Sequence, residues 1–304
     1  MPLQYSVYGN CQAAALAKCL DCISDFKNKY KYVRLKAVQR NKLSDINLIE
    51  SKFSKLDLLI YQHISDDYKI PELATRRLLN FLPNNAISIS IPSLYFNAYF
   101  PHLSPYSQLH SITNFVHDYN IMAGYVNNIP ADRLYNIIKS IDFYSQEEVN
   151  NFVRQSIFEL EKREASSNVD IPISQFISKF YKKEKLFNQF NHPTGFIFIF
   201  LVSSILKILN ISFEDSEMES IKVSDPLGAV FYPIYPSTAY HLDLKFSNDF
   251  TNDKVQGIQD KKYSYLELVH AFYDCYNSYD NSLRLYQIIE KNKPFVLNKM
   301  NEFI

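Results

Sequence analysis

The sequence predicts an α/β fold in which a short, mainly parallel sheet near the N-terminus is packed into a larger helical body. Two patterns along the 304 residues predict it. In residues 1–105, short apolar segments alternate with segments of helical periodicity, as in parallel strands joined by crossover helices. In residues 106–304, helical patterns dominate. Because no repeat or linker separates the two parts, we expect a single domain over residues 1–304 with one shared core.

The first part contains four segments that we expect to be strands and two that we expect to be helices. The strand segments are short, and they are either apolar or alternate with period two. The helix expected at 71–82 begins with Pro71, a residue suited to the first helical position. The expected strands are 4–8, 31–38, 56–62 and 86–91, and the other expected helix is 11–23.

The second part is expected to consist mainly of helices. The clearest covers 145–164, where Ser145 and Glu148 form a capping-box pattern ahead of an apolar face. The proline-rich and aromatic segment 225–240 is expected to be an ordered loop. The remaining expected helices are 173–187, 194–209 and 264–291, the last of them broken near Ser278.

The composition excludes several classes of protein. The 32 basic and 32 acidic residues balance, so nothing indicates a nucleic-acid partner. The N-terminus lacks the basic and apolar regions of a secretion signal. The longest apolar run, 196–206, is shorter than the ~20 residues that span a bilayer. We therefore expect a cytoplasmic protein without a membrane span.

The four cysteines do not form a disulfide framework, because three of them fall in one early segment. A reducing compartment fits this distribution. Cys19 and Cys22 lie three residues apart in an apolar stripe, and no second pair completes a zinc site. We therefore expect both to be core residues, and we expect no metal.

Cys11 occupies a different position, at the link between the first expected strand and the first expected helix. Gly9 and Asn10 form this link, so Cys11 falls near a helix N-terminus. Unpaired backbone N–H groups there favour an anion, lower the pKa of a thiol and supply donors for an oxyanion. Open parallel sheets also bind ligands at this edge. The alternative interpretation is a small buried cysteine in an ordinary strand–helix turn.

A second group of polar residues follows the strand expected at 56–62. Gln62 and His63 lie at the same sheet edge as Cys11, and Asp66 and Asp67 come just beyond them. Gln62 is therefore a candidate donor to a developing oxyanion. A solvated loop explains the same residues equally well.

A third element is His192, which lies between Asn191 and Pro193 at the entrance of an expected apolar helix. A cysteine nucleophile needs a base within hydrogen-bond reach. None of the other late histidines has a comparable setting, although only the fold can bring His192 to Cys11.

Arg76 and Arg77 lie in the helix expected at 71–82, near the ligand edge of the sheet. They are candidates for contacts with phosphate groups, but a solvated helix face is the favoured alternative. The sequence contains neither a glycine-rich phosphate loop nor an HExxH motif.

Four motifs, in this order, resemble those of the WcbI-type capsular polysaccharide biosynthesis proteins. They are YGNCQAAALA after the first strand, YQHIS after a later one, SIPSLYFNAYFP at 90–101 and FNHP at 190–193. The resemblance covers roughly residues 4–210, and GNCQ and NHP are its most specific parts. It implies an acetyltransferase that binds coenzyme A, takes acetyl-coenzyme A as the acyl donor and modifies a capsule sugar.

The same resemblance implies roles for the motif residues of this chain. Cys11 and His192 would be the catalytic residues. The residues that would position the substrate or hold an oxyanion are Gly9, Asn10, Gln12, Gln62, His63 and Asn191.

The motif order also looks like the layout of the SGNH hydrolases, with a cysteine in place of the serine nucleophile. In that layout an aspartate commonly stands three residues before the base histidine, and here that position is Gln189. The third member of a triad is therefore unassigned. Asp66, Asp67 or a backbone carbonyl group are the candidates to orient His192.

Three functions remain as hypotheses. The first is an acyltransferase that moves an acetyl group from acetyl-coenzyme A to a hydroxyl group of a sugar or polysaccharide. The second is an esterase of the same geometry with water as the acceptor, which differs only in how well water is excluded. The third is a non-catalytic capsule-assembly protein whose aromatic residues, 15% of the chain, serve a partner surface. Core packing explains those aromatic residues as well.

Overall fold

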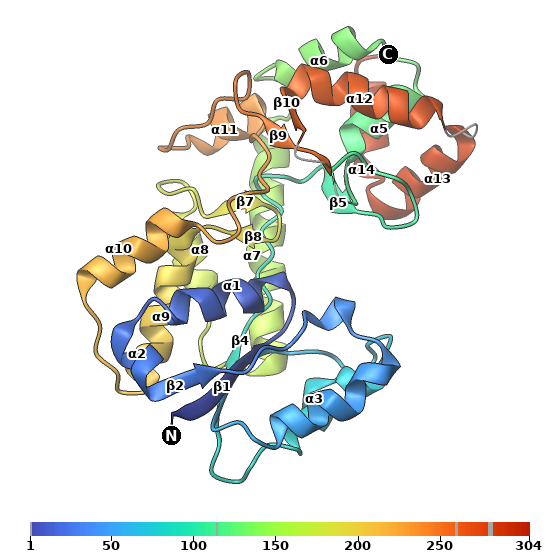
Figure 1. Cartoon of the computed structure of the whole chain (residues 1–304). Coiled ribbons are helices and arrows are strands. Elements are labelled where there is room, and N and C mark those ends of the chain that lie inside the picture. The colour runs from blue at the N-terminus through green and yellow to red at the C-terminus, as the bar shows by residue number, and fades with distance from the viewer. Residues whose placement is uncertain (1, 114, 259–260, 279–281) are drawn as a thin grey trace. The chain divides into compact units, whose positions relative to one another are not determined.

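The computed structural model in Figure 1 describes residues 2–113, 115–258, 261–278 and 282–304. These residues divide into two compact units, each built from three separate segments of the chain. Unit 1 comprises Met1–Tyr95, Ile157–Tyr181 and His192–Gly228, and unit 2 comprises Phe96–Ser156, Lys182–Asn191 and Ala229–Ile304. That the whole chain forms a single domain stays a prediction.

Unit 1 contains a sheet of four parallel strands in the order β2-β1-β3-β4. The strands are β1 (Leu3–Tyr8), β2 (Tyr30–Tyr32), β3 (Leu58–Gln62) and β4 (Ile87–Ile91). The chain passes from β1 to β2 on one side, and β3 then lies on the other side of β1. The strand order therefore reverses between β1 and β3, which confirms the α/β class. In open parallel sheets, ligands bind at the carboxyl ends of the strands where the order reverses.

The strand expected at 31–38 is shorter than predicted, because β2 ends at Tyr32. One more backbone bond continues the ladder, from the N–H of Val33 to the oxygen of Tyr5 at 2.7 Å. The chain then turns so that Leu35 and Val38 enter a core cluster. Residues 33–38 therefore form an irregular segment in place of the expected end of the strand, and Leu35 and Val38 are buried from it.

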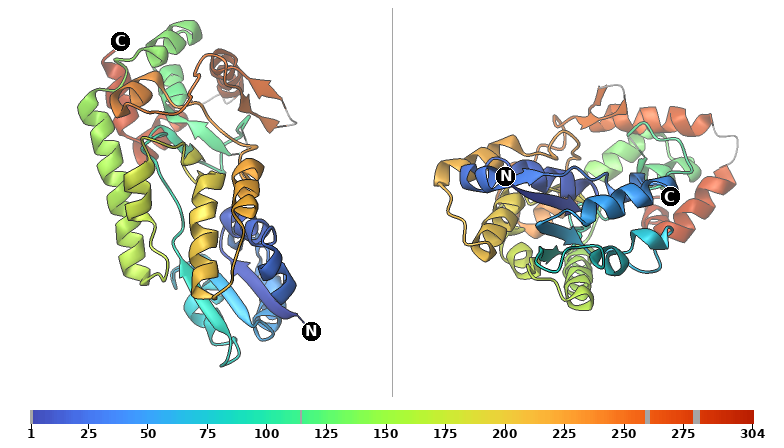
Figure 2. Two further views of the ribbon diagram at one scale, coloured as in Figure 1. Left: turned by 90° about the vertical axis from the view of Figure 1, so that its left-hand side faces the viewer. Right: turned by 60° about the horizontal axis from the view of Figure 1, so that its bottom comes forward.

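Helices cover the two faces of the sheet. Helix α3 (Ile46–Phe53) lies on the face to which Tyr8 and Leu59 point, and the rings of Tyr8 and Phe53 meet edge to face at 5.5 Å. Helix α1 (Cys11–Leu20) packs against β1 and against α9 (Gly195–Ile208), a much later part of the chain. Figure 2 shows α1 and α9 in two further views.

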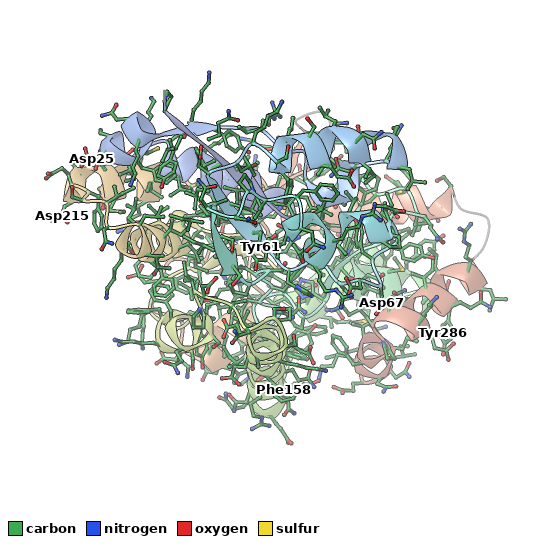
Figure 3. The ribbon with its side chains drawn as sticks, turned by 90° about the horizontal axis from the view of Figure 1, so that it is seen from below. Asp25, Tyr61, Asp67, Phe158, Asp215 and Tyr286 are labelled. Atoms are coloured by element: carbon green, nitrogen blue, oxygen red, sulfur yellow. The ribbon has the colours of Figure 1, made fainter. Side chains whose placement is uncertain are left out.

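The short helix α2 (Ser24–Lys29) is tied to α10 (Asp215–Ser224) at the edge of unit 1. The N–H of Ser24 donates to Glu217 at 2.8 Å, and the hydroxyl of Ser212 donates to Asp25 at 2.9 Å. Asp25 and Asp215 are labelled at this edge in Figure 3. Residues almost two hundred positions apart therefore complete the same unit.

Two helices differ from their predicted lengths. The region 71–82 forms the 3₁₀ turn η3 (Pro71–Leu73) and helix α4 (Thr75–Leu79), because Ala74 between them is extended. The region 173–187 forms only α8 (Ser174–Phe180), whose first N–H groups are capped by the buried carboxylate of Glu164.

Helix α7 (Gln146–Ser167) confirms the predicted long helix and contributes to both units. Its predicted capping box is present: the N–H of Ser145 donates to Glu148 at 2.7 Å, and the N–H of Glu148 donates to the Ser145 hydroxyl at 3.2 Å.

Unit 2 is mainly helical. The helix expected at 264–291 forms two helices, as the break near Ser278 predicted, and residues 279–281 lie outside the described residues. The loop expected at 225–240 ends in helix α11, which begins at Pro236. The elements of unit 2 are β5 (Leu103–Pro105), β6 (Val116–Asp118), α5 (Tyr119–Val126), α6 (Ala131–Lys139), β7 (Phe187–Gln189), α11 (Pro236–Leu242), β9 (Val255–Gln256), β10 (Lys262–Tyr263), α12 (Tyr265–Asn277), α13 (Ser282–Asn292) and α14 (Phe295–Asn301).

The prediction for the two neighbouring cysteines is confirmed for one and wrong for the other. Cys19 is buried, whereas Cys22 is exposed. Helix α1 ends at Leu20, so Cys22 lies in the following turn and no longer follows the apolar stripe of the helix. Within the described ranges, no three His, Cys, Asp or Glu side chains gather as a metal site requires. No helix among these residues is long and apolar enough to cross a bilayer.

A buried carboxylate organises unit 2. Asp118 caps α5, and its Oδ1 accepts the N–H groups of Asn120 at 2.9 Å and Ile121 at 3.1 Å. Its Oδ2 accepts the hydroxyl groups of Tyr235, at 2.8 Å, and Tyr265. Burial raises the pKa of Asp118 to about 6 despite these donors. One side chain thus connects α5, α11 and α12.

The raised pKa of Asp118 makes stability depend on pH in a defined direction. The folded chain holds this proton up to about pH 6, whereas an unfolded aspartate releases it near 3.8. The bound proton therefore stabilises the folded state at low pH, and this stabilisation is lost as the pH rises through this window. Relative to Asp118→Asn, which cannot titrate, the wild type should lose about 2–3 kcal/mol of unfolding free energy between about pH 4 and pH 7.

Urea unfolding of both proteins at the two pH values measures this change. His102, whose Nε2 lies 3.5 Å from Oδ2 of Asp118 and whose pKa burial holds well below its usual range, is present in both proteins. The comparison therefore keeps the burial of His102 constant, although Asp118→Asn removes its carboxylate neighbour. A difference in stability that does not vary with pH would show that Asp118 does not titrate in this range.

Candidate active site

The candidate site is built on the turn between β1 and α1. Asn10 caps α1, and its side-chain oxygen accepts the N–H of Gln12 at 2.9 Å. Gly9 precedes it, and a β-carbon added there would overlap Oε1 of Gln62. The sequence therefore needs glycine at this point because the side chain of Gln62 lies directly against the backbone.

Two buried amide side chains hold the turn in place. Oε1 of Gln62 accepts the N–H of Asn10 at 2.9 Å, and its Nε2 donates to Oε1 of Gln12 at 2.7 Å. Gln12 in turn bonds both backbone groups of Leu94, its Nε2 donating to the oxygen at 2.7 Å and its Oε1 accepting the N–H at 3.1 Å. We call Gln12 and Gln62 the amide pair. It links the ends of β1 and β3 and the segment after β4.

This geometry bears on the expected role of Gln62. Its Nε2 also donates to the oxygen of Pro92 at 3.5 Å, and the residue is only 1% exposed. Both N–H bonds of the amide are thus directed to protein acceptors. Donation to an oxyanion would require one of them to break, so Gln62 acts first as a positioning group.

Cys11 is the first residue of α1, has a free thiol and is partly exposed. Burial raises the pKa of this thiol, while the backbone N–H groups of Cys11 and Gln12 and the charge of Arg40 lower it. The helix end thus lowers the thiol pKa as expected, but burial outweighs this effect and the net pKa is raised. At Cys19, in the next two turns of the helix, burial raises the pKa to about 12.

His192 belongs to unit 1, as Cys11 does, and is half-buried in the short strand β8 (His192–Pro193) ahead of α9. The carboxylate of Asp225 accepts the N–H of Gly195, three residues later, at 3.1 Å. Asn191 is assigned to unit 2, where the side chain of Gln189 donates to it at 3.4 Å. The catalytic pairing of Cys11 and His192 stays a prediction.

The residues after β3 form an exposed loop, in which Asp67 is labelled in Figure 3. Nδ1 of His63 lies 3.3 Å from the hydroxyl of Thr75, so this histidine is attached to the start of α4. The exposed Arg76 lies 3.7 Å from Asp66. These contacts are typical of a solvated surface.

Arg77 likewise has an acidic partner, Glu50 at 3.4 Å. The structure therefore gives both expected phosphate contacts carboxylate neighbours, which favours the interpretation of a solvated helix face.

A sequence model of a protein family, described as polysaccharide biosynthesis enzyme WcbI, matches residues 4–214. The chain belongs to the WcbI family. The resemblance carried by GNCQ and NHP is thus confirmed, and with it a role in polysaccharide biosynthesis. A search of curated proteins gave no match.

A solved WcbI structure is similar to this chain over 99% of both chains, with a TM-score of 0.85 and 21% sequence identity. It is described as a native protein without a disulfide bond between coenzyme A and one of its cysteines. Residues 211–304, for which the sequence offered no resemblance, therefore share the fold of a WcbI protein.

Two residues of the site region were missed by the sequence analysis. Arg40 is one of several basic residues in a segment without a motif, and only its place beside the β1–α1 turn distinguishes it. Asp225 lies 33 residues after His192, at a left-handed position with φ 31° that ends α10. The helix-ending Asp-Pro pair at 225–226 was a visible signal for the second.

The close approach at Gly9 gives a direct test of the amide pair. Gly9→Ala should destabilise this WcbI-family protein by about 1–3 kcal/mol, because the new methyl group overlaps a buried side chain. In a Gln62→Ala background the same change should cost clearly less, since the space is then open.

Urea unfolding of the wild type, both single variants and the double variant completes the cycle. Additive costs would contradict the contact between Gly9 and Gln62.

Proposed function

We propose that the protein is an acyltransferase that moves an acetyl group from acetyl-coenzyme A to a hydroxyl group of a surface-polysaccharide sugar. One observation carries the proposal. Cys11 begins α1 at the point where the strand order reverses, on a turn fixed by the buried amide pair. Membership of the WcbI family supports the polysaccharide, and the coenzyme A named for the similar structure supports the donor.

The backbone of α1 is our candidate for the oxyanion site. The backbone N–H groups of Cys11 and Gln12 lower the pKa of the Cys11 thiol, which is the effect expected of donors near the sulfur. The side-chain amides of Gln62 and Gln12 are already paired, and the N–H groups of Gln12 and Ala13 donate to Asn10. The N–H of Cys11 and the side-chain Nδ2 of Asn10 are therefore the donors best able to meet a developing negative charge.

His192 would act as the general base. In a covalent route it takes the proton of Cys11, the sulfur attacks the thioester carbonyl and the coenzyme A thiol leaves with a proton. The sugar hydroxyl then attacks the Cys11 thioester and restores the free thiol. In a direct route His192 takes the proton of the sugar hydroxyl instead. Because the pKa of Cys11 is raised, the covalent route depends on this base.

Asp225 is a better candidate than Asp66 or Asp67 to orient His192. It caps the same helix that His192 precedes, whereas Asp66 pairs with Arg76 and Asp67 lies in an exposed loop.

Product analysis separates the three functions. With acetyl-coenzyme A and a sugar acceptor, we expect free thiol and acetylated sugar in equal amounts, and little thiol release without the acceptor. Cys11→Ala tests whether the sulfur takes part. Equal thiol release without the acceptor would support the esterase. Absence of both reactions, in a chain that binds coenzyme A by calorimetry, would support the non-catalytic protein.

If His192 is the base, His192→Ala should lower turnover by about 10²–10⁴-fold, the usual contribution of a positioned acid–base group. Coenzyme A affinity should hold, because the base acts on a proton and not on the phosphates. Steady-state rates and calorimetry on the purified variant measure both quantities.

His63→Ala is the matched control, since His63 follows β3 at the same sheet edge but is tied to Thr75. If His192 only supports the start of α9, its loss should cost on the order of 1 kcal/mol of stability and leave turnover per folded molecule unchanged. A normal rate in His192→Ala with a collapsed rate in His63→Ala would move the base to position 63.

A further inference from the structure

A short 3₁₀ turn, η1 (Val38–Arg40), packs directly on the β1–α1 turn. The N–H of Val38 donates to the backbone oxygen of Gly9 at 2.8 Å. The side chain of Val38 is 5% exposed and lies in the core cluster that contains Tyr8. The bond between Val38 and Gly9 therefore attaches the 3₁₀ turn to the β1–α1 turn. Val38 lies two residues before Arg40, and Gly9 lies two residues before Cys11.

Asn41 makes this turn rigid. It is 6% exposed, and its Nδ2 donates to the backbone oxygens of Lys36, Ala37 and Val38 at 3.3–3.4 Å. Its Oδ1 accepts no hydrogen bond from the described residues. The turn thus carries one unused buried acceptor next to Arg40, available to a water molecule or a substrate N–H group.

Arg40 differs from the other arginines near the sheet edge. Arg76 and Arg77 each have a carboxylate neighbour, whereas the described residues provide no ion pair or hydrogen bond for the exposed guanidinium of Arg40. Its charge instead acts on Cys11, where it opposes the effect of burial on the thiol pKa. The backbone bond between Val38 and Gly9 thus places a cation without a described ion pair in the segment that packs on the Cys11 turn.

We infer that Arg40 is a positioning residue of the site, whose charge stabilises the Cys11 sulfur as an anion. The inference rests on the proposed function only in taking Cys11 as the reacting group. The thiol proton leaves to solvent or to the base, and the charge left on sulfur faces the guanidinium. Because Arg40 is exposed, this interaction is screened by salt.

Alkylation of Cys11 by iodoacetamide tests the inference without donor or acceptor. The sulfur forms a bond to the acetamide carbon and iodide leaves, so the rate follows the thiolate fraction. Peptide mapping separates Cys11 from the exposed Cys22. Arg40→Gln should slow the reaction at neutral pH by about threefold to tenfold, because loss of the positive charge raises the pKa of the Cys11 thiol further.

Two further variants separate charge from structure. Arg40→Lys should restore most of the rate, and Arg76→Gln, which removes another exposed arginine that is paired with Asp66, should leave it unchanged. Raising the salt concentration to about 1 M should slow the wild type toward Arg40→Gln and leave that variant nearly unaffected.

An unchanged pH profile in Arg40→Gln would overturn the inference, as would a slowing that Arg40→Lys shares. Failure of acetyl transfer with the expected alkylation pattern would count against the proposed function alone.

Discussion

The hydrogen bond between the buried amides of Gln62 and Gln12 is the contact on which the candidate site depends. It joins the ends of β1 and β3 at the point where the strand order reverses, and each amide also bonds backbone groups of a third chain segment. A buried amide that loses its partner costs about 1–3 kcal/mol. The turn that carries Cys11 is therefore fixed by a hydrogen-bond network in which the polar atoms of both amide side chains are bonded.

The pKa of the Cys11 thiol results from opposing effects of its surroundings. The compact packing that fixes the turn also removes water from the sulfur, and this raises the thiol pKa. The N–H groups of α1 and the cation of Arg40 act in the opposite direction. At Cys19 the helix N-terminus is too distant to help and the nearby charge of Asp225 opposes ionisation, so burial dominates. Position along one helix therefore distinguishes a candidate reactive thiol from an inert one.

Local patterns predicted the parts of the fold whose causes are local. The capping box at Ser145, the four parallel strands and the turn at Gly9 depend on neighbouring residues, and the structure bears them out. The early end of β2 and the exposure of Cys22 depend on where the chain leaves the sheet or the helix. Arg40 carries no local signal, and the Asp-Pro pair at 225–226 signals only the end of a helix. Neither residue could be assigned to the site from local patterns, because each acts on a segment that is distant in the sequence.

The division of unit 1 into three segments explains why its parts need one another. The free side of β4 is bonded by Asp170, which exchanges hydrogen bonds with the backbone and hydroxyl of Ser90. The outer face of α1 is covered by α9. Residues 1–95 alone would leave a sheet edge unpaired and an apolar helix face in water, both of which favour aggregation. The segment that supplies α9 also carries His192, so the chain cannot complete the core around Cys11 without bringing this histidine into the same unit.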